Sequence, residues 1–179
     1  MEVHTIGYTK KTAAEFFGLL EKNKIKQLID VRLNNVSQLC GFTKRDDLAY
    51  FLGKICGASY VHEPIFAPSK EIFDDYGKKR ISWDQFEERF LDLLNERKIE
   101  DRVDRAVFQT PTVLLCSEPT PDRCHRRLVA EYFQKRWGDL HINHFLRRLW
   151  ESKCKSPRAC ARRRVLKTGF CYKPVGRFC

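Results

Sequence analysis

Residues 112–127 decide the fold, and they read TVLLCSEPTPDRCHRR. Val113, Leu114 and Leu115 form a short apolar run of the kind that makes a buried strand, with Cys116 and Glu118 expected at its carboxyl end. Thr120 followed by Pro121 is typical of a helix start, with threonine as the N-cap and proline as the first helical residue. Apolar residues at helical spacing follow, namely Leu128, Val129, Tyr132, Phe133 and Trp137. We therefore predict a strand, a turn and a helix.

Chemically active side chains gather where this strand meets this helix. They are Cys116, Glu118, Cys124, His125 and Arg126. Open α/β sheets bind their ligands at the carboxyl ends of strands, so these side chains are expected to line a cleft there.

The same alternation of strands and helices continues along the chain. Apolar runs predict strands at 3–6, 27–31, 58–62 and 140–142, and helices at 12–23, 43–56 and 82–97. Thr12, Thr43 and Ser82 are the expected helix caps. Residues 64–79 show little periodicity and predict a long connection. The pattern indicates an α/β fold with a mostly parallel sheet of about five strands and helices on both faces.

The composition suits a globular protein with a real core, since 42% of the 179 residues are hydrophobic. No run approaches the roughly 20 apolar residues of a membrane span, and the N-terminus lacks the pattern of a secretory signal. We therefore expect a cytoplasmic protein without a membrane partner. The eight cysteines are then thiols or metal ligands rather than disulfides.

The last part of the chain differs from the rest in charge. Residues 151–179 hold nine Lys or Arg and a single acidic residue, so they carry +8 of the net charge of +11. We expect one α/β domain at 1–148, folding alone, and a flexible basic tail at 149–179. The tail suits a nucleic acid or another polyanion. Its cysteines offer a zinc site only weakly, because they lack the Cys-x-x-Cys spacing; they are Cys154, Cys160, Cys171 and Cys179.

Five short motifs give the chain a resemblance to a known family. They are Thr5-Ile6-Gly7, Asp30-Val31-Arg32, Tyr60-Val61-His62-x-Pro64, Cys116-x-Glu118 and Cys124-His125-Arg126. In this order they resemble the bacterial and archaeal family called domain of unknown function 488, over residues 3–145. The resemblance implies a compact three-layer α/β domain and a site, and no reaction. Tyr8 stands where the family usually has His, so a base or ligand at that position is not carried over.

Four residues are the catalytic candidates. Cys124 should have a lowered thiol pKa, because it is near a helix start and several arginines. Cys116 is a second nucleophile, a redox partner of Cys124 or a buried thiol. Glu118 is a general acid or base, or the partner of an arginine, and His125 is a base or a packed side chain. The two cysteines could also bind zinc together with His125, but seven residues separate them, which is not a common zinc spacing, so no metal site is predicted.

Further residues are candidates for binding the substrate: Arg126, Arg32, Asp30, Gly7, Tyr8 and His62. Arg126 and the helix amides suit a phosphate or carboxylate. Asp30 and Arg32 lie beside the site or form a structural ion pair. Gly7 permits a ligand to approach the backbone or simply makes a turn, and Tyr76 is placed to fold over the cleft.

Two functions fit these residues. The first is an enzyme with a cysteine, glutamate and arginine cleft for an anionic, nucleotide-like or nucleic-acid-derived substrate. The alternative is a non-catalytic module that binds a nucleotide or nucleic acid in the same cleft and with the tail. The sequence names no cofactor, reaction or oligomeric state.

Overall fold

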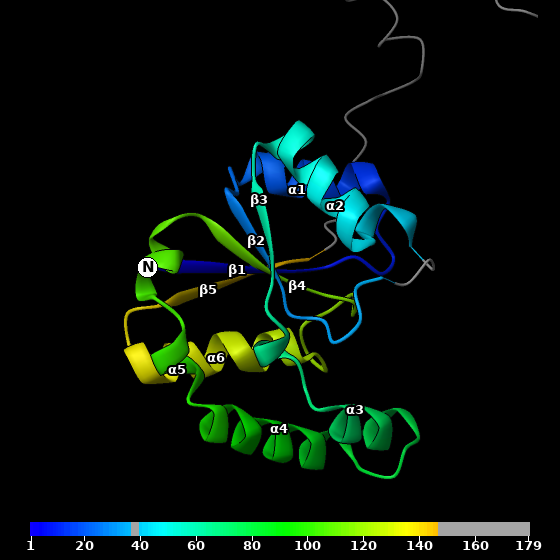
Figure 1. The fold of residues 1–179 in the computed structure, drawn as a ribbon, viewed down its shortest axis with the longest axis vertical. Helices are drawn as coiled ribbons and strands as arrows, with labels where there is room; N and C mark the ends of the chain where they lie inside the picture. Colours follow the sequence, from blue (N-terminus) through cyan, green and yellow to red (C-terminus); the bar gives the residue numbers. More distant parts are fainter. Residues whose placement is uncertain (37–39, 147–179) are drawn as a thin grey trace, which may run out of the picture. The chain divides into compact units, whose positions relative to one another are not determined.

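The computed structural model describes residues 1–36 and 40–146 and contains one five-stranded, all-parallel sheet (Figure 1). The spatial order of the strands is β3-β2-β4-β1-β5. Their bounds are β1 Glu2–Gly7, β2 Gln27–Asp30, β3 Ser59–His62, β4 Thr112–Cys116 and β5 His141–Phe145. The α/β fold with a parallel sheet, predicted from the sequence, is confirmed.

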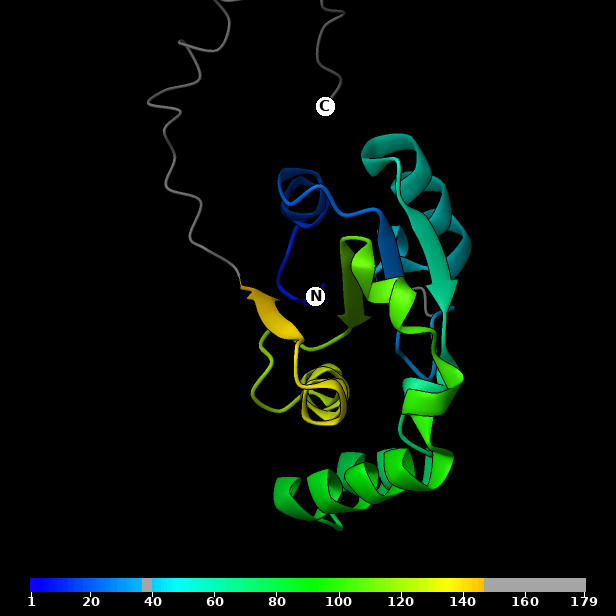
Figure 2. The same ribbon diagram turned by 90° about the vertical axis from the view of Figure 1, so that its left-hand side faces the viewer.

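Helices cover both faces of this sheet (Figure 1). One face holds α1 Ala13–Lys22, α2 Arg45–Phe51 and the π-helix Leu52–Cys56 that continues α2. The other holds α6 His125–Trp137, α4 Trp83–Arg97, α3 Lys70–Gly77 and the short α5 Ile99–Arg102. Figure 2 shows α6 between the sheet and α4. Among the described helices, none is both long and apolar enough to cross a membrane.

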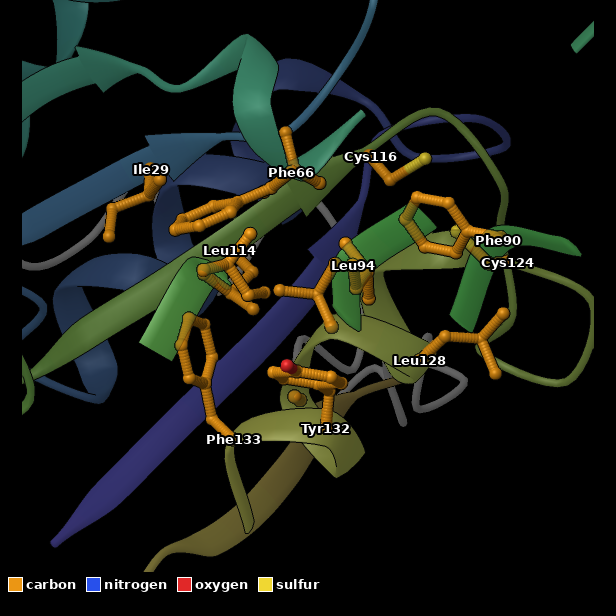
Figure 3. Packing of buried hydrophobic residues seen from close by; sticks show 14 of the residues in the cluster. Ile29, Phe66, Phe90, Leu94, Leu114, Cys116, Cys124, Leu128, Tyr132 and Phe133 are labelled. Atoms are coloured by element: carbon orange, nitrogen blue, oxygen red, sulfur yellow. The ribbon is translucent and has the colours of Figure 1, made fainter. Parts of the chain in front are cut away.

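The central strand β4 contributes side chains to the hydrophobic cores on both faces of the sheet, because successive side chains of a strand point to opposite faces. Val113 and Leu115 pack with α1 and α2, whereas Leu114 and Cys116 pack with α4 and α6. Figure 3 shows Cys116 at the end of the strand and beside Phe90, at the edge of the core that α4 and α6 form with the sheet. The alternation of side chains along β4 therefore directs Cys116 toward α4 and α6.

Two predicted helix caps are confirmed. Thr12 and Glu15 form a reciprocal capping box at the start of α1, and Ser82 and Gln85 form another at the start of α4. In each box, the hydroxyl accepts the N–H three residues on and the longer side chain accepts the N–H of the cap residue.

Other local predictions are wrong. Helix α2 begins at Arg45, because the hydroxyl of Thr43 donates to the carbonyl of Cys40 instead of capping the helix. Residues 64–79 are not a plain connection, since they contain the 3-10 helix Pro64–Phe66 and α3, which Ser69 caps. Near the end of the predicted 43–56 helix, the apolar side chain of Ile55 is 42% exposed.

The predicted start of α6 at Thr120 is also wrong. The helix begins at His125, with Cys124 in the N-cap position. Residues 117–123 form a loop instead, whose Glu118 carbonyl accepts a hydrogen bond from the guanidinium of Arg126. The loop and β1 approach so closely that a Cβ atom added at Gly7 would lie 1.7 Å from the Glu118 carbonyl oxygen.

Gly7→Ala is therefore expected to be poorly tolerated. The added methyl overlaps backbone, so we expect it to lower the free energy of unfolding by about 3 kcal/mol. Gly18→Ala, within α1, is the matched control because nothing lies within 4 Å of its added Cβ. It should raise stability by about 0.5–1 kcal/mol. Urea unfolding measures both, and equal stabilities would contradict the close approach.

Candidate functional site

A cavity of about 330 Å³ opens at the carboxyl ends of β2 and β4. Three parts of the chain line it: the residues that follow β2, the aromatic side chains of α3 and α4, and residues 116–125. Four of the predicted catalytic residues take part in this lining, namely Cys116, Glu118, Cys124 and His125. The cavity thus lies at the sheet edge where α/β folds bind ligands.

Cys116, Cys124 and His125 form a buried cluster at the bottom of this cavity, which we call the sulfur cluster. Cys116 is 3% exposed and Cys124 is 2% exposed. The Nδ1 atom of His125 lies 3.5 Å from Cys116 Sγ, and its Nε2 atom lies 2.8 Å from the Val31 carbonyl oxygen. Because a carbonyl only accepts hydrogen bonds, Nε2 carries the proton and Nδ1 presents a lone pair to the sulfur.

The two thiols differ in how readily they ionise. Burial opposes ionisation of Cys116, but the Cys124 thiol, the Arg126 guanidinium and the N–H groups of Glu118 and Ser117 together lower its pKa. Burial raises the pKa of Cys124, and the neighbouring Cys116 raises it further. This is opposite to the expected lowering of the Cys124 pKa at the helix start. Cys116 is therefore the more readily ionised thiol of the pair.

Arg126 lies behind the sulfur cluster and does not line the cavity. Its side chain is 1% exposed, and its Nη1 atom donates to the Glu118 carbonyl at 2.7 Å and to Cys124 Sγ at 3.1 Å. Its Nε atom lies 3.4 Å from the hydroxyl oxygen of Thr5. Within residues 1–36 and 40–146, no carboxylate forms an ion pair with it. Its polar partners are thus two oxygen atoms and a sulfur atom rather than a carboxylate.

Asp30 and Arg32 form a buried ion pair at the cavity edge. The Asp30 carboxylate accepts from Arg32 Nε at 2.8 Å and Nη2 at 2.6 Å, and from the Tyr60 hydroxyl at 2.7 Å. Burial and this carboxylate raise the pKa of Tyr60. Arg32 also donates to the Thr43 carbonyl at 2.8 Å. Arg32 reaches the cavity, whereas Asp30 holds the guanidinium in place from behind.

The remaining binding candidates lie outside the cavity lining and support it. The Tyr8 ring lies 5.3 Å from the guanidinium carbon of Arg32, and His62 Nε2 lies 2.9 Å from the Arg32 carbonyl oxygen. The backbone that comes close to Gly7 is that of Glu118, in the same protein.

Sequence reasoning missed one cation and most of an aromatic wall. Arg123 lines the cavity, is exposed, and has no hydrogen bond or ion pair with any other described residue. The aromatic wall consists of Phe73, Tyr76, Trp83 and Phe86. Trp83 and Phe86 belong to the apolar pattern that predicts the 82–97 helix, but that pattern does not show that they face the site. The tail predicted at 149–179 lies outside the described residues.

The chain was compared with known proteins. The sequence pattern described as Domain of unknown function DUF488 matches residues 12–133. The chain belongs to the DUF488 family. The match begins just before α1 and ends within α6, so it includes the sulfur cluster, Glu118 and Arg32. No curated protein and no solved structure matches the chain.

The ion pair at the edge of this DUF488 site is expected to be essential to stability. Asp30→Asn leaves the buried Arg32 without its counter-charge, so the free energy of unfolding should fall by about 3 kcal/mol. Asp46→Asn is the control, because its partner Arg45 and Asp46 itself are exposed. Urea unfolding should show no change for that variant. Similar small effects for both variants would show that Arg32 does not depend on Asp30.

Proposed function

We propose that this protein is an enzyme that binds an anionic, nucleotide-like substrate in the cavity and transforms it at the sulfur cluster. One observation carries the proposal: a single cavity presents an unpaired arginine, an aromatic wall and a buried cluster of two thiols and an imidazole. Together these groups provide charge recognition, ring recognition and reactive side chains.

Arg123 is the group best placed to receive the substrate's anionic group. A guanidinium binds phosphate or carboxylate through parallel hydrogen bonds, and this one has no partner among the described residues. Arg32 also lines this cavity, but Asp30 holds its guanidinium in position and balances its charge. Arg123 is therefore the arginine of this lining whose charge is available to a bound anion.

The aromatic wall suits a planar ring attached to that anion. Trp83 and Phe86 are stacked with ring centroids 5.1 Å apart, and Tyr76 meets Trp83 edge-on at 5.6 Å. Nucleobases stack favourably on such side chains. The cavity volume of about 330 Å³ is at the small end of ligand pockets. A mononucleotide fits this description better than a polymer does.

Glu118 supplies the proton transfer in this proposal. Its side chain is exposed, lines the cavity and, within the described residues, has no hydrogen-bond or ion-pair partner. A carboxylate in that position is available to a bound substrate as a general acid or base. The sulfur cluster lies on the same side of the cavity and provides the reacting centre.

The alternative is a nucleotide or nucleic-acid binding module without turnover. The charge of residues 151–179 favours it, because a segment with a net charge of +8 attracts polyanions. In either case we propose a cytoplasmic location, where the four free cysteines among the described residues stay reduced.

Calorimetry with the four 5′-ribonucleoside monophosphates tests the binding step. We expect at least one to bind, and Arg123→Ala to weaken its affinity by about 10–100-fold, because a charge-assisted contact is lost. Arg105→Ala is the matched control, since Arg105 is an exposed arginine outside the cavity lining. Absence of binding at millimolar nucleotide, or equal affinity in both variants, would overturn the proposal.

Product analysis of the same mixtures separates the enzyme from the module. Conversion of the bound nucleotide that disappears in Glu118→Gln, with its affinity retained, supports the enzyme. Binding without conversion, weakened by neutralising the arginines of the tail, supports the module instead.

A further inference from the structure

We propose that Cys116, Cys124 and His125 bind one zinc ion whose fourth coordination position faces the cavity. The site itself stands on its own geometry, and only its catalytic use rests on the proposed function. Thiolates and imidazole are the ligands that zinc prefers, and a set of two cysteines and one histidine is found in catalytic zinc sites.

The distances match a zinc tetrahedron. One ligand atom from each residue lies within 4.8 Å of the other two. The Cys116 sulfur lies 3.5 Å from the Nδ1 atom of His125. A zinc ion with bonds of about 2.3 Å to sulfur and 2.0 Å to nitrogen holds tetrahedral sulfur and nitrogen ligands about 3.5 Å apart. Cys116 and His125 are therefore already spaced as zinc requires, and the Cys124 sulfur lies within 4.8 Å of both ligand atoms.

The fold explains why the ligand spacing in the sequence is unusual. Cys116 is the last residue of β4, and Cys124 and His125 stand at the start of α6. The intervening loop brings the start of α6 back beside the end of β4. The hydrogen bond from Arg126 to the Glu118 carbonyl holds the loop in this position. Two regular elements thus supply the ligands, which gives a rigid site although seven residues separate the cysteines.

Both kinds of ligand also have the supporting contacts of a metal site. Ligating histidines usually donate their second ring N–H to an acceptor, and His125 Nε2 lies 2.8 Å from the Val31 carbonyl oxygen. Arg126 donates to Cys124 Sγ at 3.1 Å, so the sulfur has a charged donor behind it. These contacts hold both side chains from the side away from Cys116 Sγ in the case of His125, and by a charged donor in the case of Cys124.

The fourth position is the part of the site that a substrate would use. All three ligand residues line the cavity together with Glu118, so three protein ligands leave one position open to it. Two thiolates neutralise the charge of Zn²⁺, and the buried Arg126 then favours an anion at the open position. An anionic substrate group meets that requirement, and the metal would act on it as a Lewis acid.

Metal analysis of the full-length chain tests this site. The tail also contains four cysteines, so the reference protein is the full chain with those four replaced by serine. We expect it to hold one zinc per chain. Cys116→Ser in this background should lose the zinc, whereas Cys56→Ser, a half-buried free cysteine elsewhere, should keep it. Cobalt(II) should replace zinc and give an intense thiolate-to-cobalt charge-transfer band that Cys124→Ser weakens.

A second measurement covers the case in which these variants do not fold. The reference protein, stripped with a chelator and still folded by circular dichroism, should take up one equivalent of added Zn²⁺. Failure to take up zinc, together with rapid alkylation of Cys116 by iodoacetamide, would overturn the site and leave a free thiolate. Zinc binding without any mononucleotide binding would instead keep the site and overturn the proposed function.

Discussion

The buried guanidinium of Arg126 is the constraint on which the site depends. It joins the hydroxyl of Thr5 in β1, the carbonyl of Glu118 in the loop and the sulfur of Cys124 at the start of α6. A buried charge is costly unless it is paired, and no carboxylate among residues 1–36 and 40–146 pairs with this one. The loop must therefore stay against β1, where only glycine fits at position 7, so that the guanidinium keeps its oxygen and sulfur acceptors.

Arg126 and Arg123 show how neighbouring cations take different roles. The first is enclosed and fixes the loop, whereas the second is exposed on the cavity and is available to a ligand. Three residues apart along the chain, they lie on opposite sides of the start of α6. The same division applies to Asp30 and Arg32, since the carboxylate is structural and the guanidinium reaches the cavity. Around the site, residues that hold the structure in place, Arg126 and Asp30, thus lie close in sequence to residues that line the cavity, Arg123 and Arg32.

The sequence was sufficient for the sheet and for part of the site. The apolar run at 113–115 had to be a buried strand, and the capping boxes at Thr12 and Ser82 use only local contacts, so both could be predicted. The start of α6 could not, because the Arg126–Glu118 contact overrides a good local start at Thr120. The direction of Arg126 depends on the phase of α6. The direction of Arg123 and the assembly of two cysteines and a histidine depend on a loop whose path the residues do not encode locally.

X-ray absorption at the zinc edge tests the central claim most directly. With the four tail cysteines replaced by serine, the account predicts two sulfur ligands at about 2.3 Å and two lighter ligands at about 2.0–2.1 Å. The two lighter ligands would be the imidazole nitrogen and the occupant of the open position. A shell of sulfur alone, or a chain that holds no zinc, would contradict the claim that Cys116, Cys124 and His125 form a metal centre at the cavity.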